Sequence, residues 1–211
     1  MDDRPIVRLE LTSDYICPWC YLGITRLDRI KTELSDEIDL EIGHFPYFLY
    51  PQIPKDGSPK EAFASKTKRG MGKALKMESE KEGISINYKK ISKIPNSFEA
   101  HRCTGLIKDH ELQWAFSKAI FQSYFEEGEN IGDVEVLRKI ALKVGVSKEE
   151  VSLFELREKG KEEVDQMVNQ AKSNFISVVP TVNFDGKLSM SGLQEDILWK
   201  RFIKKAAVLQ A

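Results

Sequence analysis

The sequence predicts an α/β fold in which a βαβ unit and a later ββα unit flank a long block of helices. Three observations carry this prediction. Strand-like alternation of apolar and polar residues occurs only towards the two ends of the 211-residue chain. Residues 60–175 lack such alternation and show helical spacing instead. A stretch rich in proline and glycine, residues 50–59, separates the first unit from these helices.

The first unit begins with a strand over Ile6–Thr12, where apolar and polar residues alternate. Apolar residues then recur at helical spacing, at Leu22, Ile24, Leu27, Ile30 and Leu34. A second alternating stretch, Ile38–Phe48, predicts the next strand. Because a helix connects the two strands, we expect them to be parallel and joined by a right-handed crossover.

The middle of the chain is expected to be helical. The predicted helices are Lys60–Gly83, Ser97–His110, Glu111–Glu127, Asp133–Gly145, Lys148–Glu158 and Glu162–Asn174. Two of them have clear start signals, because Asp133 precedes an apolar periodic run and Ser147 opens a capping box.

The last unit returns to strand patterns. Val178–Phe184 predicts a strand, Asp185-Gly186 a hairpin turn, and Leu188–Ser191 the return strand. Leu193–Val208 predicts a final helix. Neither end has enough strands to form a stable sheet alone, so the helical block is interpreted as an insertion. The predicted domain limits are 1–52 and 161–211 for the two halves of one domain and 53–160 for the inserted helical domain.

Composition excludes some classes of partner. The 32 basic and 33 acidic residues give a net charge of −1, which offers no support for a nucleic-acid partner. Residues 1–17 lack the basic start and apolar core of a signal peptide, and no run approaches the ~18 apolar residues of a spanning helix. We therefore expect a cytoplasmic protein without membrane association.

The chemistry is predicted at the sequence YICPWCYL, which places Cys17 at the end of the first strand and the start of the first helix. Unpaired N–H groups at a helix N-terminus favour a thiolate on Cys17. Pro18 suits the first helical position, where no N–H donor is needed. Cys20 lies one helical turn further on, close enough to form a disulfide and more deeply buried. We predict that Cys17 attacks and that Cys20 resolves the mixed disulfide.

Two alternatives to a redox pair exist for Cys17 and Cys20. A zinc site needs about four ligands, and the remaining candidates form no second closely spaced pair. Those candidates are Cys103, His44, His101 and His110. Two inert buried thiols would also fit the spacing, but helix N-termini at sheet edges are usually accessible. Redox chemistry is therefore favoured, with no metal.

Pro180 supports a redox site from far along the chain, because it opens a predicted strand. A cis bond after Val179 would turn the Val179 backbone outward as an unpaired edge. A substrate chain could pair with that edge beside Cys17. An ordinary trans proline that starts a strand is the alternative.

Four segments in the expected order carry a resemblance to a known family. They are Asp14–Cys20, Asn96–Arg102, Phe121–Gly128 with Ile131–Asp133, and Val179–Thr181 with Ser191–Gln194. Together they closely resemble the DsbA-like branch of the thioredoxin superfamily, and within it the cytosolic FrnE-type oxidoreductases. The resemblance implies a thioredoxin-like fold (βαβ…ββα) with a large inserted α-helical domain, dithiol–disulfide exchange at Cys17 and Cys20, and a cis Pro180.

The resemblance also implies that Asn96, His101 and Arg102 face the active-site groove. Arg102 or a protonated His101 would stabilise the Cys17 thiolate, or His101 would shuttle the proton. Alternatively, Asn96 caps a helix and Arg102 pairs structurally with an acidic neighbour. The substrate-binding set implied in this way is Pro18, Trp19, Asn96, His101, Arg102, Val179 and Pro180.

The sequence departs from the family pattern at Cys103, where relatives carry an aliphatic residue, and we interpret Cys103 as a small core side chain. Ser177-Val178 replaces a glycine-containing run before Pro180, and no additional C-terminal cysteine pair is present for a relay.

The predicted function is thiol–disulfide exchange with protein or small-thiol substrates, with glutathione as a candidate redox partner and no other cofactor. Because cytosolic glutathione would keep an oxidising pair reduced, reductase or isomerase work is favoured. A monomer or weak dimer is expected. The rivals are a glutathione-dependent isomerase or transferase, of the 2-hydroxychromene-2-carboxylate isomerase or kappa-class type, and a non-catalytic peptide-binding module.

Overall fold

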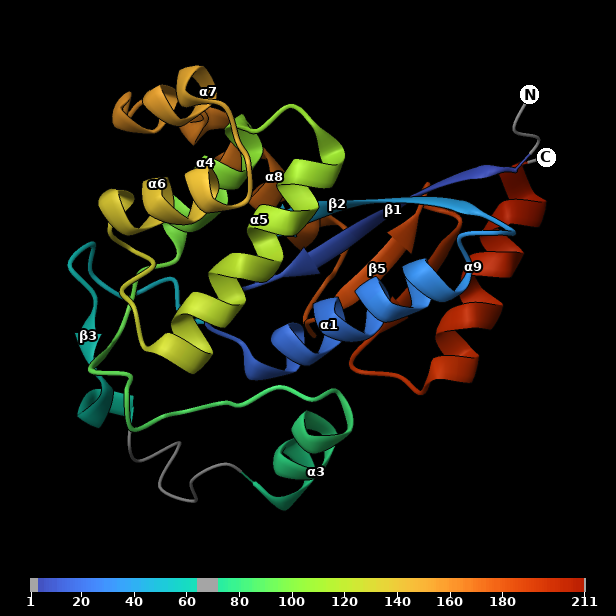
Figure 1. The fold of residues 1–211 in the computed structure, drawn as a ribbon, viewed down its shortest axis with the longest axis horizontal. Coiled ribbons are helices and arrows are strands. Elements are labelled where there is room, and N and C mark those ends of the chain that lie inside the picture. The colour runs from blue at the N-terminus through green and yellow to red at the C-terminus, as the bar shows by residue number, and fades with distance from the viewer. Residues whose placement is uncertain (1–3, 64–71, 211) are drawn as a thin grey trace.

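A four-stranded mixed sheet, in the order β2-β1-β5-β6, forms the centre of the molecule (Figure 1). The computed structural model describes residues 4–63 and 72–210. β1 (Ile6–Ser13) and β2 (Asp39–Pro46) are parallel. β5 (Thr181–Phe184) runs antiparallel to β1, and β6 (Leu188–Ser191) runs antiparallel to β5. The parallel crossover and the C-terminal hairpin that the sequence predicts are confirmed.

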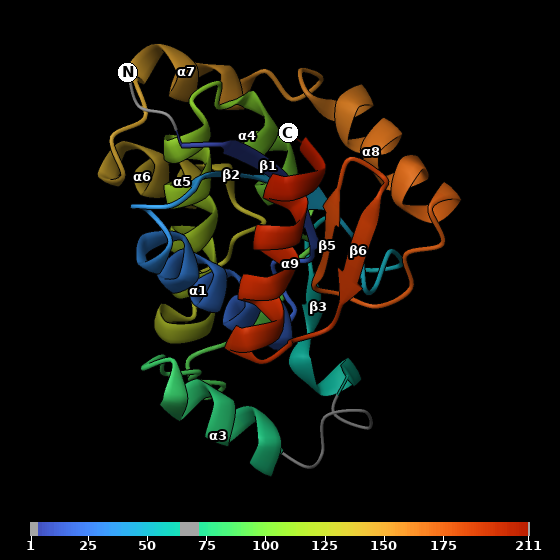
Figure 2. The same ribbon diagram turned by 90° about the vertical axis from the view of Figure 1, so that its right-hand side faces the viewer.

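Two helices, α1 (Pro18–Glu33) and α9 (Asp196–Gln210), pack against each other on one side of the sheet (Figures 1 and 2). Trp199, Ile203 and Ala206, spaced four and three residues apart, form the buried face of α9. The helix starts three residues later than predicted. The preceding segment turns instead, so that the Gln194 carbonyl accepts a hydrogen bond from a buried arginine of α1.

The helical block lies beside β2, which α4, α5 and α8 all contact (Figure 1). Its elements are α4 (Phe98–Leu106), α5 (His110–Gln122), the π-helical turn η2 (Ser123–Glu127), α6 (Val134–Lys143), α7 (Lys148–Ser152), the 3-10 turn η3 (Leu153–Glu155) and α8 (Lys161–Ser173). No helix in the described ranges is long and apolar enough to cross a membrane. The predicted domain limits stay a prediction.

The predicted helix Lys60–Gly83 is wrong over part of its length. Lys60–Phe63 forms a 3-10 turn, η1, and the helix α3 covers only Lys73–Lys81. Gly72 has extended backbone angles (φ −56°, ψ 149°), so α3 begins at Lys73. Residues 64–71 of this prediction lie outside the described residues.

Other boundaries differ for local reasons. His110 begins α5, because the Asp109 carboxylate accepts a hydrogen bond from the Leu112 N–H (2.9 Å) and caps that helix. The predicted helix over Lys148–Glu158 stops at residue 152 and passes into η3. A two-stranded ribbon of β3 (Ser58–Pro59) and β4 (Lys93–Ile94) was not predicted, because two residues are too few to show alternation.

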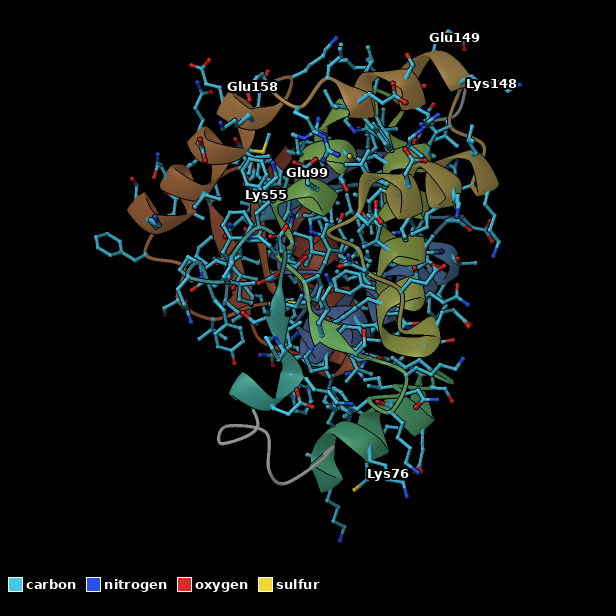
Figure 3. The ribbon with its side chains drawn as sticks, turned by 90° about the vertical axis from the view of Figure 1, so that its left-hand side faces the viewer. Lys55, Lys76, Glu99, Lys148, Glu149 and Glu158 are labelled. Carbon is cyan, nitrogen blue, oxygen red and sulfur yellow. The ribbon has the colours of Figure 1, made fainter. Side chains whose placement is uncertain are left out.

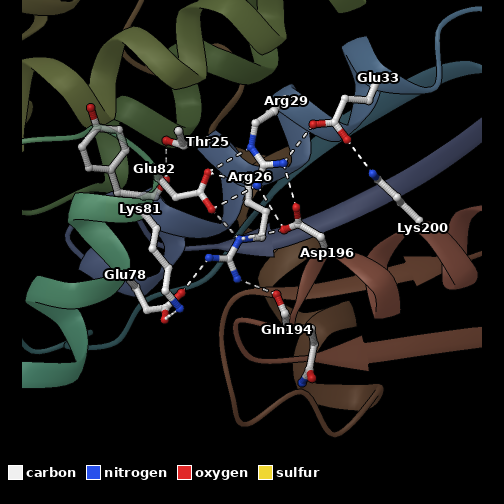
Figure 4. A network of polar contacts seen from close by, with 11 residues as sticks. Thr25, Arg26, Arg29, Glu33, Glu78, Lys81, Glu82, Gln194, Asp196 and Lys200 are labelled. Carbon is white, nitrogen blue, oxygen red and sulfur yellow. Dashed lines mark hydrogen bonds and ion pairs between the residues drawn. The ribbon is translucent and has the colours of Figure 1, made fainter.

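A cluster of charged side chains joins α3 to α1 and to the start of α9 (Figure 4). The buried Arg26 guanidinium pairs with Glu82 (2.6 Å) and Glu78 (2.7 Å) of α3 and its following turn. Arg29 pairs with Asp196 at 2.8 Å. Because buried guanidinium and carboxylate groups are stable only when paired, this cluster fixes α3 below α1.

Candidate active site

Cys17 is the N-cap residue of α1, as predicted. Its backbone is extended (φ −92°, ψ 115°), its N–H donates to the Asp14 carbonyl (3.0 Å), and Pro18 is the first helical residue. The Cys17 carbonyl accepts hydrogen bonds from the N–H groups of Cys20 and Tyr21, each at 3.1 Å. This backbone arrangement holds the Cys17 sulfur at the positive end of the helix.

The two cysteines of the pair lie in different surroundings. Both are free thiols, and Cys17 is 4% exposed while Cys20 is completely buried. Burial raises the pKa of the Cys20 thiol well above its usual range, and the neighbouring Cys17 sulfur raises it further. Cys20 therefore keeps its proton at neutral pH. Trp19, between them, is 36% exposed.

Pro180 follows a cis peptide bond, which confirms the expectation for the Val179–Pro180 bond. Its ring packs directly on α1, because a Cβ atom added at Gly23 would lie 2.9 Å from the Pro180 Cγ. The Pro180 carbonyl accepts a hydrogen bond from the Gly192 N–H (2.7 Å). In the part of the chain that the structure describes, the peptide groups of Val179 make no backbone hydrogen bond. The structure thus brings Pro180 to the helix that carries both cysteines.

A buried carboxylate lies three residues before Cys17. Asp14 is 1% exposed, and its carboxylate accepts hydrogen bonds from the Ser97 hydroxyl and the Leu49 N–H, each at 2.8 Å. His101 of α4 places its Nε2 3.8 Å from the Asp14 Oδ1. That Nε2 atom is buried and lacks a hydrogen-bond partner among the described residues. The structure therefore brings His101 to the segment just before the cysteine pair.

A second histidine, His44 of β2, joins this buried group. The Tyr15 ring lies between the two histidines, with centroids 4.4 Å from His44 and 4.7 Å from His101. The Tyr15 hydroxyl shares hydrogen bonds with Thr104 (2.7 Å) and Ser117 (3.0 Å). Burial, and then the electrostatic influence of the nearby His101, hold the pKa of His44 well below its usual range, so His44 is neutral.

Sequence reasoning did not assign roles to Asp14 and His44. A signal was present for Asp14, because it directly follows the predicted buried strand and precedes the cysteine motif. His44 alternates with apolar residues in β2, which predicts that it points inward but not what it contacts.

Arg102 lies elsewhere. The residue is completely buried, and its guanidinium donates to Glu99 at 2.6 and 2.9 Å. It also donates to three backbone carbonyls, those of Phe154, Leu156 and Lys159. These contacts tie α4 to the chain around η3 and fill the donor capacity of the side chain. The alternative of structural pairing describes Arg102 in this structure.

Asn96 also makes structural contacts. Its side-chain oxygen accepts from the Phe98 N–H (2.9 Å) at the start of α4, and its amide donates to the Ile53 carbonyl (2.7 Å). Asn96 nevertheless lines a cavity of about 340 Å³ together with Asp14 and Ile16. Ile16 directly precedes Cys17 in the sequence. Around this cavity lie Lys55, Glu99 and Glu158, labelled in Figure 3.

Among residues 4–63 and 72–210, no three His, Cys, Asp or Glu side chains gather in a way that could hold a metal ion. Cys103 lies in the core of α4, and burial raises the pKa of its thiol to about 12. The candidate site therefore consists of Cys17 and Cys20, with the buried Asp14 near Cys20 and His101 next to Asp14.

Comparisons with known proteins identify the family of this chain. The family model described as DSBA-like thioredoxin domain matches residues 8–199. An uncharacterized protein of Bacillus subtilis, YwbO, is 28% identical over 145 residues, which cover 66% of this chain and 67% of YwbO.

Two solved structures are similar in fold. The first is a probable DsbA oxidoreductase of Streptomyces coelicolor, SCO1869, with a TM-score of 0.78, 23% identity and coverage of 95% of this chain and 89% of the other. The second is the cytosolic disulfide reductase DsbM of Pseudomonas aeruginosa, solved with glutathione, with a TM-score of 0.64, 13% identity and 97% coverage of both chains.

Proposed function

The chain belongs to the family of DSBA-like thioredoxin domains, and on this premise we propose that it is a thiol–disulfide oxidoreductase acting through Cys17 and Cys20. The observation that carries the proposal is the asymmetry of the pair. Cys17 caps α1, where the helix favours a thiolate, while burial keeps the Cys20 thiol protonated.

In the proposed reaction, the Cys17 thiolate attacks one sulfur of a substrate disulfide. A mixed disulfide forms and the second substrate sulfur leaves as a thiolate, which takes a proton. Cys20 then loses its proton and attacks the Cys17 sulfur. The Cys17–Cys20 disulfide forms, and the first substrate sulfur leaves and is protonated. The protein gives two electrons to the substrate, and the reverse sequence oxidises a substrate dithiol.

The proton of Cys20 needs an acceptor, because burial disfavours its thiolate. We assign this role to the Asp14–His101 pair. The Nε2 of His101 is unpaired and 3.8 Å from the Asp14 carboxylate, so it has a free site for a proton and a counter-ion beside it. His101→Ala should therefore slow the second step, the attack by Cys20, more than the first.

Substrate chains are proposed to lie across Val179 and Pro180, beside Pro18 and Trp19. The free peptide groups of Val179 support this placement, since an extended chain could pair with them. The cavity at Asn96, which Asp14 and Ile16 also line, would then receive a substrate group near the segment that precedes Cys17. Glutathione is a candidate thiol partner, and the glutathione-bound reductase of similar fold supports that assignment and a cytoplasmic location.

The presence of two cysteines favours redox chemistry over the rival functions. A glutathione-dependent isomerase or transferase would need no resolving cysteine, and a peptide-binding module would need neither. Cys20 has no exposed surface that a binding partner could use.

The decisive experiment is the redox equilibrium of the pair in glutathione buffers, read by mass-tagging of free thiols. A reversible Cys17–Cys20 disulfide, lost in Cys17→Ser and unaffected in Cys103→Ser, is the expected result. A reduction potential of about −120 to −200 mV would indicate an oxidant or isomerase, and one of about −270 mV would indicate a reductant. Absence of any disulfide across these buffers would refute the proposed function.

A further inference from the structure

Arg26 connects the helix of the cysteine pair, α1, to the turn between β6 and α9. The residue is only 3% exposed, and its Nη1 donates a hydrogen bond to the Gln194 carbonyl at 2.7 Å (Figure 4). Its Nε donates to the Glu82 carboxylate at 2.6 Å, and its Nη2 donates to the Glu78 carboxylate at 2.7 Å. Each of the three guanidinium nitrogens thus has a different acceptor. The guanidinium therefore fixes the backbone at residue 194 relative to both α1 and α3.

The turn over residues 191–194, which we call the Gln194 turn, is closed by a hydrogen bond of its own. The Gln194 side-chain amide donates to the Ser191 carbonyl at 2.7 Å. Within the same turn, the Gly192 N–H donates to the Pro180 carbonyl, also at 2.7 Å. The Gln194 turn is therefore bonded to Arg26 at one end and to the backbone of Pro180 at the other.

A second set of hydrogen bonds joins the Gln194 turn to the residues around Val179. The Thr181 hydroxyl donates to the Val178 carbonyl (2.6 Å) and shares a hydrogen bond with the Ser191 hydroxyl (2.8 Å). These bonds lie on either side of Val179 and Pro180 in the sequence. Since the peptide groups of Val179 make no backbone hydrogen bond to any residue that the structure describes, its position depends on these neighbours.

The same face of α1 also contacts Pro180 directly. Gly23 lies three residues before Arg26, and residues at this spacing share one face of a helix. A Cβ atom added at Gly23 would lie 2.9 Å from the Pro180 Cγ, so the proline ring packs on the helix backbone. The helix that begins after Cys17 therefore holds the Val179–Pro180 segment at two points, directly at Gly23 and through Arg26 and the Gln194 turn.

Resting on the proposed function, we propose that Arg26 is a positioning residue for exchange with polypeptide substrates. It holds the Gln194 turn, and through this turn the edge at Val179 and Pro180, in a fixed place relative to the helix that carries Cys17. Arg26 touches neither the substrate nor a reacting sulfur, and it transfers no group. Its effect is on where an extended substrate chain lies when its disulfide meets the Cys17 thiolate.

Arg26→Lys tests this role, because lysine keeps the positive charge but lacks the planar fork that reaches three acceptors. The measurement compares kcat/KM for a peptide with one disulfide against kcat/KM for dithiobis(nitrobenzoate), a small aromatic disulfide. The peptide can pair with the Val179 backbone, whereas the small disulfide has no peptide groups. We expect a loss that is roughly tenfold larger for the peptide, because a displaced edge misaligns the bound chain. The glutathione equilibrium of the cysteine pair should keep its wild-type value.

Arg29→Lys is the matched control, since it makes the same substitution in the same charged cluster (Figure 4). Arg29 pairs with Asp196 at 2.8 Å and with Glu82 at 3.3 Å, and no hydrogen bond joins it to a backbone carbonyl of the described residues. Its substitution should leave the ratio of the two kcat/KM values unchanged. A peptide-specific loss in Arg29→Lys as large as that in Arg26→Lys would refute the role of the bond to Gln194.

Gln194→Met is a second variant that does not disturb the buried charges. It removes the amide that donates to the Ser191 carbonyl and keeps the length of the side chain and the carbonyl that Arg26 binds. The loss of one hydrogen bond predicts a peptide-specific decrease in kcat/KM of roughly threefold. The thermal midpoint of each variant reports whether it is folded.

The outcomes separate this proposal from the proposed function. If the wild-type protein forms no disulfide between Cys17 and Cys20, the proposed function fails. If the wild-type protein exchanges disulfides and a folded Arg26→Lys variant loses the same factor with both substrates, or loses nothing with either, the role of Arg26 is refuted and the exchange activity stands. Should Arg26→Lys not fold, an unchanged ratio of the two kcat/KM values in Gln194→Met would refute the role equally.

Discussion

At Gly23 a substitution by alanine should have opposite effects on helix propensity and on packing. In α1 it is buried, and an added Cβ would lie 2.9 Å from the Cγ and 3.3 Å from the Cβ of Pro180. Contacts this short require either α1 or Pro180 to move. Since α1 is fixed by the core, Gly23→Ala should move Pro180 away from the helix that carries the cysteine pair.

Two opposing terms set the magnitude. Replacing a helical glycine by alanine stabilises the helix by up to about 1 kcal/mol. Inserting a methyl group into a packed contact costs about 1–3 kcal/mol. The free energy of unfolding of Gly23→Ala should therefore fall by about 0–2 kcal/mol. Exchange should suffer more, by roughly tenfold or more, because small misplacements of reacting groups slow catalysis strongly.

Gly105 in α4 provides the matched control. It is also a helical glycine, but an added Cβ there would meet nothing within 4 Å. Gly105→Ala should gain about 0.5–1 kcal/mol. Urea denaturation of both variants and the reduction rate of a small disulfide are the assays. If both variants gain the same stability and exchange at the wild-type rate, the inferred contact between α1 and Pro180 is wrong.

Three further predictions follow from single side chains. Lys81 and then Arg26 lower the pKa of the Glu78 carboxyl. The stabilisation that Glu78 provides is therefore fully present above its unfolded-state pKa of about 4.3 and is lost as the pH falls through its lower folded-state pKa. In Glu78→Gln the free energy of unfolding should fall less steeply with acidification, as measured by urea denaturation at pH values between about 3 and 6. Phe175 has a φ of 54° and is 90% exposed, so Phe175→Gly should raise the free energy of unfolding by about 0.5 kcal/mol, and a loss above about 1 kcal/mol would contradict the strain argument. Burial raises the pKa of the Cys103 thiol to about 12, so alkylation at pH 8 followed by mass spectrometry should modify Cys103 only in the unfolded protein, and rapid labelling of the native protein would oppose its interpretation as a core residue.

The regular parts of the fold could be predicted from the sequence because their patterns are long. The alternation in β1 and β2 and the spacing of apolar residues in α1 extend over at least eight residues each. β3 and β4 have two residues each, and the π-turn η2 continues a helical pattern without a sequence signal. The length of the local sequence pattern therefore determines which helices and strands can be predicted.

Spacing along the chain predicted only the part of the site that is local in sequence. The distant Pro180 was assigned from its place at the start of a strand, and His101 from the family resemblance. Cys17 and Cys20 lie within one helical turn, so their spacing in the sequence predicts that they are neighbours. His101 and Asp14 lie 87 positions apart, and their proximity depends on how α4 packs beside β2. Arg102 illustrates the converse, because a motif placed it at the site while packing directs it to the chain around η3.

The order of the strands has a consequence for how the chain is made. β1 lies between β2, which follows it closely in sequence, and β5, which begins at Thr181. At synthesis rates of about 5–20 residues per second, one edge of β1 waits roughly 10–30 seconds for its partner. During that interval the nascent chain exposes an unpaired strand shortly before Cys17, the proposed nucleophile. A chaperone that covers residues 6–20 on the ribosome would therefore protect the edge from aggregation and the thiol from premature oxidation.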